Sequence, residues 1–119
     1  MAKSLAIAIT KAPFGTIHAA EAIRLANGAI SYGHEVTILL LGDGVYTAKT
    51  GQKAEETGWT SLSPLLEKLV SSGRAKVLVD NGSTVERGVH AEDLVAGAVV
   101  SEGRSISLAM ADADRCVVF

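Results

Sequence analysis

The chain of 119 residues has few residues of several kinds: one cysteine, two prolines and only 4% aromatic residues. One cysteine cannot form an internal disulfide, which fits the reducing cytoplasm. So few aromatic residues cannot build a platform on which nucleic-acid bases stack. The net charge of -2 also gives no basic field that would hold nucleic acid or an anionic membrane. We therefore expect neither kind of partner.

Long apolar runs are missing too, so no stretch could cross a bilayer. The start of the chain, Met1-Ala2-Lys3-Ser4, has neither the core nor the cleavage pattern of a signal peptide. We expect a cytoplasmic protein with a single domain over residues 1–119. Apolar residues make up 48% and charged residues 20%, which excludes disorder. The apolar share slightly exceeds what a small monomer needs, so we expect part of it in a subunit interface.

Short apolar runs alternate with helical patterns along the chain. The runs are typical of strands buried on both faces and span residues 5–9, 36–41, 77–79, 96–100 and 116–119. Strands that alternate with helices imply right-handed crossovers. The sequence therefore predicts an α/β fold with a parallel sheet of about five strands and helices on both faces.

Cap residues mark where the helices between these strands begin. Thr16 is a plausible N-cap of the first long helix, and Ser63 of the second. Ser83 and Glu86 have the spacing of a capping box for a short helix that runs to Gly88. Two further helical stretches are predicted, at 45–49 and 106–113.

In such a sheet, ligands bind beyond the carboxyl ends of the strands, where the strand order reverses. The predicted crevice follows the first three strands, and the helix start at Thr16 would favour an anion there. The ligand class is a small anionic or polar molecule. The candidate ligand-binding residues are Thr10, Lys11, Phe14, Gly15, Thr16, Gly42, Asp43, Asp80 and Asn81.

Metal and cofactor motifs are not found in the sequence. His18, His34 and His90 are scattered, and none has a second ligand at helical or hairpin spacing. The glycines at 42–51 do not form a phosphate-binding loop, because the lysine and threonine precede the last glycine instead of following it. We expect no metal site and no cofactor.

Several segments, taken in order, resemble the DsrE/DsrF/TusCD family. They are Lys11-Ala12-Pro13-Phe14-Gly15-Thr16, Leu40-Leu41-Gly42-Asp43-Gly44-Val45-Tyr46, Gly51-Gln52, Val85-Glu86-Arg87-Gly88-Val89 and Ala113-Asp114-Arg115-Cys116-Val117-Val118-Phe119. The match runs nearly end to end and is nearest to the TusC/DsrF type. The resemblance implies a flavodoxin-like three-layer sandwich that assembles into trimers or hexamers and takes part in intracellular sulfur trafficking.

The chain departs from the family pattern at its reactive position. In DsrE-type members, six residues separate the cysteine that accepts persulfide sulfur from an Arg-Gly pair. Counting back from Arg87-Gly88 leads to Asp80. A carboxylate cannot hold a persulfide, because sulfur transfer needs a thiolate. Asp80 is then either a turn residue before the next helix or a group that binds a ligand or transfers a proton.

Two further residues have alternative interpretations. Cys116 is expected to be a buried, inert thiol of the last strand, and the alternative is an accessible thiol that accepts sulfur. Trp59 is expected either at a subunit interface or folded back on its own domain.

Two functional hypotheses follow from the sequence. In the first, the chain is a non-carrier subunit that supplies structure and interface to cysteine-bearing paralogues in a sulfur-relay oligomer. In the second, it is a stand-alone homo-oligomer that binds a small ligand in the crevice around Asp80. Whether the chain is an enzyme stays open at this point.

Overall fold

The structure is a computed structural model that describes residues 3–52 and 61–119. Five parallel strands form one sheet in the order β4-β3-β2-β1-β5. They are β1 (Ser4–Ile9), β2 (Glu35–Leu40), β3 (Ala75–Asp80), β4 (Ala98–Ser101) and β5 (Arg115–Val118). The predicted α/β fold with a parallel sheet is confirmed.

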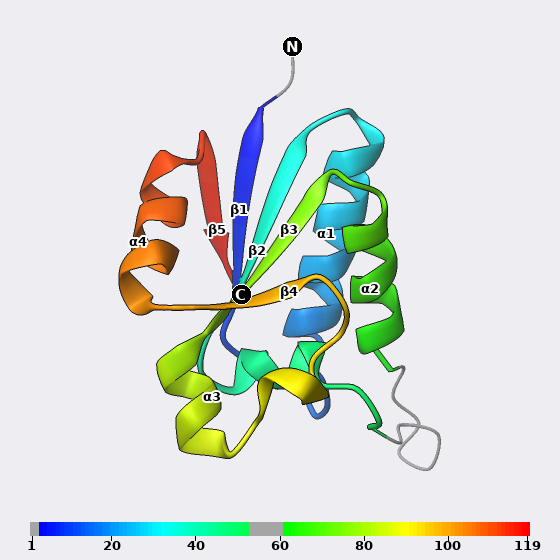
Figure 1. Ribbon diagram of the computed structural model, residues 1–119. Coiled ribbons are helices and arrows are strands. Elements are labelled where there is room, and N and C mark those ends of the chain that lie inside the picture. Colours follow the sequence, from blue (N-terminus) through cyan, green and yellow to red (C-terminus); the bar gives the residue numbers. More distant parts are fainter. Residues whose placement is uncertain (1–2, 53–60) are drawn as a thin grey trace.

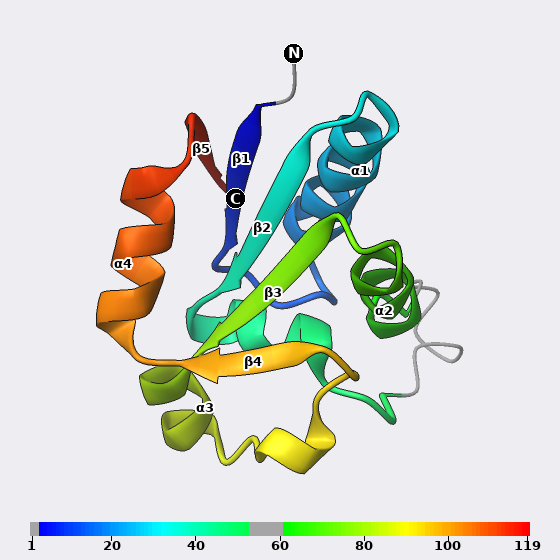
Figure 2. The same ribbon diagram turned by 45° about the horizontal axis from the view of Figure 1, so that its top comes forward.

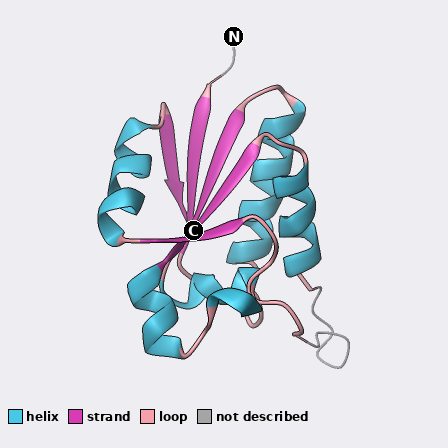
Figure 3. Ribbon diagram, viewed as in Figure 1, coloured by secondary structure: helices cyan, strands magenta, loops and turns pink. Residues whose placement is uncertain are grey.

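Helices lie on both faces of this sheet, and a third group closes its carboxyl edge. Helices α1 (His18–Ser31) and α2 (Ser63–Ser71) cover one face, and α4 (Gly103–Asp112) covers the other (Figures 1 and 2). Helix α3 (Asn81–Arg87) and the 3₁₀ helices η1 (Gly42–Ala48) and η3 (Ala91–Asp93) gather at the carboxyl ends of the strands (Figure 3). This is the expected flavodoxin-like three-layer arrangement. No helix in the described ranges is long and apolar enough to cross a membrane.

Side chains alternate between the two faces of each strand, and they build two cores of different size. The core under α1 and α2 is the larger, and on the three inner strands it includes Leu5, Ile7, Ile9, Val36, Ile38, Leu40, Ala75, Val77 and Val79. The buried core under α4 consists of Ala6, Ala8, Leu39 and Ile106. One helix thus covers this face of the sheet, whereas two helices cover the other. Parts of the face under α4 therefore stay open to solvent.

The strand order reverses at β1. From β1 the chain adds β2, β3 and β4 on one side, and α4 then carries it back to β5 on the other side of β1. Thr10 follows β1 at this reversal. Its N–H and its Oγ1 both donate to the Phe119 carbonyl oxygen, at 2.9 and 2.7 Å. These two bonds tie the carboxyl end of β1 to the end of β5.

The predictions for the first two helix caps are wrong. Helix α1 has Ile17 at its N-cap with helical backbone angles, so Thr16 lies outside the helix and makes no cap hydrogen bond. In α2, Ser63 is the first helical residue, and Leu62 takes the cap position without a side-chain bond. Packing of the apolar faces, rather than a polar cap, sets these helix starts.

Helix α3 is capped by a different residue from the one predicted. Its N-cap is Asp80, whose side chain accepts from the backbone N–H of Ser83. Ser83 is therefore inside the helix, and the predicted capping box with Glu86 is wrong. The end at Gly88 is confirmed, because that residue has a left-handed φ of 64° and its N–H donates the last helical bonds to the carbonyl oxygens of Thr84 and Val85.

Cys116 is exposed, which contradicts the expected buried thiol. It lies in β5 opposite Ala6 of β1, on the face that α4 covers. An apolar strand run predicts burial only when both faces are covered, and here the single helix of this layer leaves the edge strand open. The predicted interface residue Trp59 lies outside the described residues.

Candidate functional site

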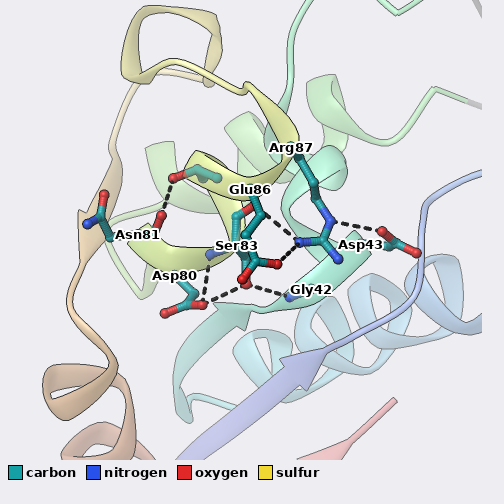
Figure 4. A network of polar contacts seen from close by, with 8 residues as sticks. Gly42, Asp43, Asp80, Asn81, Ser83, Glu86 and Arg87 are labelled. Carbon is teal, nitrogen blue, oxygen red and sulfur yellow. Dashed lines mark hydrogen bonds and ion pairs between the residues drawn. The ribbon is translucent and has the colours of Figure 1, made fainter.

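The site is built around Asp80, where β3 passes directly into α3. The Oδ2 atom of Asp80 accepts from Ser83 N at 3.1 Å and from Ser83 Oγ at 2.6 Å (Figure 4). Both donors belong to the first turn of α3, where unpaired N–H groups and the helix dipole favour a negative charge. The Asp80 carboxylate is thus held as the cap of the helix.

Ser83 extends this contact from β3 to the end of β2. Its side chain is buried, and Ser83 Oγ accepts from Gly42 N at 2.9 Å while it donates to Asp80. Gly42 has a φ of 54°, and a Cβ there would lie 3.6 Å from the carbonyl oxygen of Thr10. The turns after β1, β2 and β3 therefore meet, as expected for the carboxyl edge of a parallel sheet.

Arg87 completes the network from the last turn of α3. Its Nε donates to Asp43 Oδ1 at 2.9 Å, and its Nη1 donates to the Ser83 carbonyl oxygen at 3.2 Å. Glu86 lies 3.5 Å from Nη1. The hydrogen bond to Asp43 raises the pKa of Arg87 above its ordinary value, so the guanidinium is charged throughout the physiological range.

The structure brings together three of the predicted site residues, Gly42, Asp43 and Asp80, with Thr10 beside them. Asn81 is exposed, and its carbonyl oxygen accepts from Thr84 Oγ1 at 2.8 Å. The others lie on the loop before α1. Among the described residues, no hydrogen bond joins that loop's Lys11, Phe14, Gly15 or Thr16 to the Asp80 network. By hydrogen bonding, the predicted ligand residues that the structure describes thus fall into two groups, one in the Asp80 network and one on the loop before α1.

One polar atom of this loop stands out. The Oγ1 atom of Thr16 is buried and has no hydrogen-bond partner in the described part of the chain. A buried hydroxyl without a partner loses its bonds to water and gains none in return. Thr16 is thus a predicted ligand contact whose buried hydroxyl pairs with no group of the described residues.

Ser83, Glu86 and Arg87 are the three residues of the network that the list of candidate ligands did not include. Asp80, Ser83 and Arg87 are separated by three and four residues, which puts them on one side of a helix. That spacing could have identified them, but the capping-box interpretation assigned Ser83 to a different role.

The chemistry available in this network is limited. Asp80 Oδ2 accepts two hydrogen bonds, and the charge of Asp43 is balanced by Arg87. Four surface hollows of the described residues have linings that contain neither Asp80 nor Asp43. No group of three or more His, Cys, Asp or Glu residues within the described ranges is placed to hold a metal ion. The network joins strand ends, and its one side-chain hydroxyl, Ser83 Oγ, already makes two hydrogen bonds.

Cys116 is the one thiol of the chain, and it is far from this network in the sheet. It lies in β5, and strands β1 and β2 separate β5 from β3, at whose end Asp80 is found. A sulfur atom on Cys116 would therefore be outside the crevice that the fold predicts.

Comparison with known proteins places the chain among a group of small α/β proteins. The model of the DsrE/DsrF-like family matches residues 3–119. The intracellular sulfur oxidation protein DsrF of Allochromatium vinosum is 35% identical over 85 residues, which are 71% of this chain and 62% of that protein. The chain thus spans less than two thirds of this relative. An uncharacterized protein of Methanocaldococcus jannaschii is 34% identical over 95% of this chain and 96% of its own.

Solved structures share the same fold. The YchN protein from E. coli aligns with a TM-score of 0.85 at 21% identity and covers 100% of both chains. A protein of unknown function from Methanobacterium thermoautotrophicum aligns with a TM-score of 0.74 at 11% identity, over 98% of this chain and 99% of its own. At these identities the likeness concerns the fold alone.

Proposed function

Because the chain belongs to the DsrE/DsrF-like family, we propose that it serves a sulfur relay as a non-carrier subunit. In this role it supplies structure and contact surface to cysteine-bearing relatives and takes no sulfur itself. The name of the Allochromatium vinosum relative supports the link to sulfur oxidation inside the cell.

The observation that carries this proposal is the state of Asp80. Sulfur transfer requires an acceptor thiolate that attacks the outer sulfur of a persulfide while the donor thiolate leaves. Asp80 holds the position that the resemblance assigns to that thiolate, and its carboxylate caps α3 instead. The same residue therefore has a structural task that accounts for its charge, its neighbours and its place in the sequence.

Exposed apolar side chains support a role in assembly. Large apolar residues that stay open to solvent include Tyr32 at 86%, Val118 at 60%, Val99 at 55% and Leu108 at 53%. Of these, Tyr32 lies in a hollow together with the apolar Leu5, Leu25, Ala29 and Phe119, and a contiguous apolar surface of this kind is typical of protein contacts, whereas single exposed residues are not. We propose an oligomer, with a trimer or hexamer as the form that the family resemblance implies.

The first experiment is native mass spectrometry on the protein purified gently from its own cells. A mixed assembly that contains cysteine-bearing relatives is the expected result. A homo-oligomer alone, with no other chain bound, would contradict the role as a partner subunit.

Persulfide loading tests the non-carrier part of the proposal separately. The folded protein is incubated with glutathione persulfide and its intact mass is measured. We expect no stable gain of a sulfur atom, although Cys116 is exposed. Cys116→Ser is the matched control: a gain that the wild type shows and this variant loses would make Cys116 a carrier and end the proposal.

A second candidate function is favoured by one observation, the buried Thr16 Oγ1, which has no hydrogen-bond partner among residues 3–52 and 61–119. We propose that a small polar or anionic ligand at the loop before α1 would satisfy it. The test is a thermal-shift screen of such compounds with wild type and Thr16→Val. A compound that raises the melting temperature of the wild type and not of the variant is the expected result. An equal shift in both would contradict the site.

A further inference from the structure

A groove runs between the two helices that cover the larger core. Helices α1 and α2 lie side by side on the same face of the sheet (Figure 1), and side chains of both line a hollow of about 630 Å³. The residues that α1 contributes extend from Ala20 to Ile30, which is about 15 Å along the helix axis. We call this hollow the α1–α2 groove. Its volume is within the range of roughly 300 to 1,000 Å³ that small-molecule sites have.

Most of the lining of the α1–α2 groove is apolar. The apolar residues are Ile23 and Ile30 of α1, and Leu62, Leu65 and Leu69 at the start and along the length of α2. Ile23, Leu62 and Leu69 belong to the buried core beneath the helices, whereas Leu65 is 42% exposed. An apolar group placed in the groove would remove the surface of Leu65 from water, which favours binding.

Two cations, one from each helix, also line the groove. Lys68 of α2 forms no ion pair with any described residue. Arg24 of α1 contacts Glu21 at 3.5 Å through Nη1 alone, and its side chain is 81% exposed. Such an exposed pair contributes little, and a guanidinium has five N–H donors. Both cations can therefore bind a further negative group.

The balance of charge distinguishes this groove from three other hollows of the described residues. Each of those three has an acidic residue in its lining, Glu35, Glu21 or Asp112, next to its basic residues. The described lining of the α1–α2 groove contains Arg24 and Lys68 and no acidic residue. Long basic side chains often cover apolar surface with their stems, so the cations alone would not indicate a ligand. An apolar groove with an unbalanced positive charge on both sides does.

We propose that the α1–α2 groove binds an amphipathic anion, a small free molecule with an apolar chain and one anionic head such as a carboxylate. The chain lies against Leu65 and its apolar neighbours, and the head lies between Arg24 and Lys68 at the mouth of the groove. Thr16 does not line this groove, so the site is separate from the ligand site proposed for the loop before α1. The inference goes beyond the proposed function and does not depend on it.

The test is isothermal titration calorimetry of the full chain with decanoate as the probe. Butanoate has the same head and a shorter chain, and decyltrimethylammonium has the same chain and the opposite charge. Each methylene group that leaves water changes the affinity by about fourfold. We therefore expect one decanoate per chain and at least tenfold weaker binding of both matched compounds. No binding of decanoate at millimolar concentration overturns the proposal, as does equal binding of either matched compound.

Leu65→Asp tests whether the probe occupies the groove. The variant puts a negative charge against the apolar chain and should weaken decanoate binding by at least tenfold. It should still fold, because Leu65 is partly exposed and an acidic residue is favourable in the first turn of a helix. The matched control is Leu108→Asp on α4, where the leucine is 53% exposed on the other face of the sheet. Its affinity should equal that of the wild type, and an equal loss in both variants would contradict the site.

The contribution of the cations is tested by Lys68→Gln and Arg24→Gln, which keep most of each stem and remove the charge. Each should weaken decanoate binding by about two- to fivefold, as expected for a charge pair at the surface. Lys76→Gln, on β3 outside the groove, is the control for net charge and should have no effect. If Lys76→Gln weakened binding as much as Lys68→Gln, the overall charge rather than the groove would hold the head, and the proposal would fail. These variants also decide the question if Leu65→Asp does not fold.

Discussion

Two regions of the sheet differ in how far their hydrogen-bonding groups find partners. At the carboxyl ends of β2 and β3, Asp80, Ser83 and Arg87 bond to one another and to neighbouring backbone. At the outer edge of β5, the backbone of Cys116 and Val118 faces outward, away from β1. The first region looks like the functional centre from the sequence, but Asp80 Oδ2, Ser83 Oγ and the Arg87 guanidinium all bond within the fold. The second has free groups and exposed apolar surface, and so it is the region better able to bind another molecule.

The largest loss of stability in the first region is expected for Gly44→Ala. A Cβ on this residue of η1 would overlap the carbonyl oxygen of Ile9 at the end of β1. Backbone must move to relieve the overlap, so we expect a loss of about 3 kcal/mol in the free energy of unfolding. Urea denaturation measures it.

Gly82→Ala is its matched control in the same region. Gly82 lies in α3, where a Cβ would meet only Asp80 Oδ2 at 3.7 Å, an ordinary contact. Alanine in a helix should stabilise by roughly 0.5 to 1 kcal/mol. Equal effects of the two substitutions would show that η1 does not pack tightly against the end of β1.

Removing the hydroxyl of Ser83 should have the next largest effect. Ser83→Ala leaves the N–H of Gly42 without its acceptor and removes one donor to Asp80. The expected loss is about 2 kcal/mol, the penalty for a buried group that loses its partner. Ser105→Ala on the exposed surface of α4 should change the stability by less than about 0.5 kcal/mol in the same urea titration. A loss no larger than this control's would mean that the network does not hold the strand ends.

Asp80→Ala has a smaller expected effect, about 1 kcal/mol, which is typical of a lost helix cap. Asp80→Asn keeps an oxygen acceptor and should lose only part of this. If Asp80 instead bound a ligand at the expense of stability, both substitutions would stabilise the protein in thermal unfolding.

The smallest effect concerns the start of β5. Ser4 N donates to Asp114 Oδ2 at 2.8 Å, and this bond, with a second one from Ser4 Oγ, holds the pKa of the Asp114 carboxyl below its ordinary value. A lowered pKa contributes stability above the ordinary value of about 3.9 and loses it as pH falls through the folded pKa. Asp114→Asn should therefore be less stable than wild type at neutral pH, and the difference should shrink below about pH 4. A difference that does not change between neutral and acid pH would contradict the role of this charge.

The sequence predicted the strands and the fold class because strands of a buried parallel sheet consist of short, continuous apolar runs. It also placed Gly42, Asp43 and Asp80 at one edge, since the carboxyl ends of parallel strands always meet. It failed at the caps of α1, α2 and α3, where several polar residues stand close to each helix start and the local pattern cannot choose between them. It failed again at Cys116, because burial depends on which helix covers the strand.

The sequence by itself determined the order of strands and helices, the turn positions and the acidic residue at the end of β3. All of these follow from propensities and periodicities that act within a few residues. Only the tertiary structure decided that Asp80 caps α3 and is linked through Ser83 to the end of β2, and that β5 is an open edge. Both depend on contacts between segments far apart in the chain, such as Gly42 with Ser83 and β5 with β1. Local sequence does not encode which partner such a group will meet.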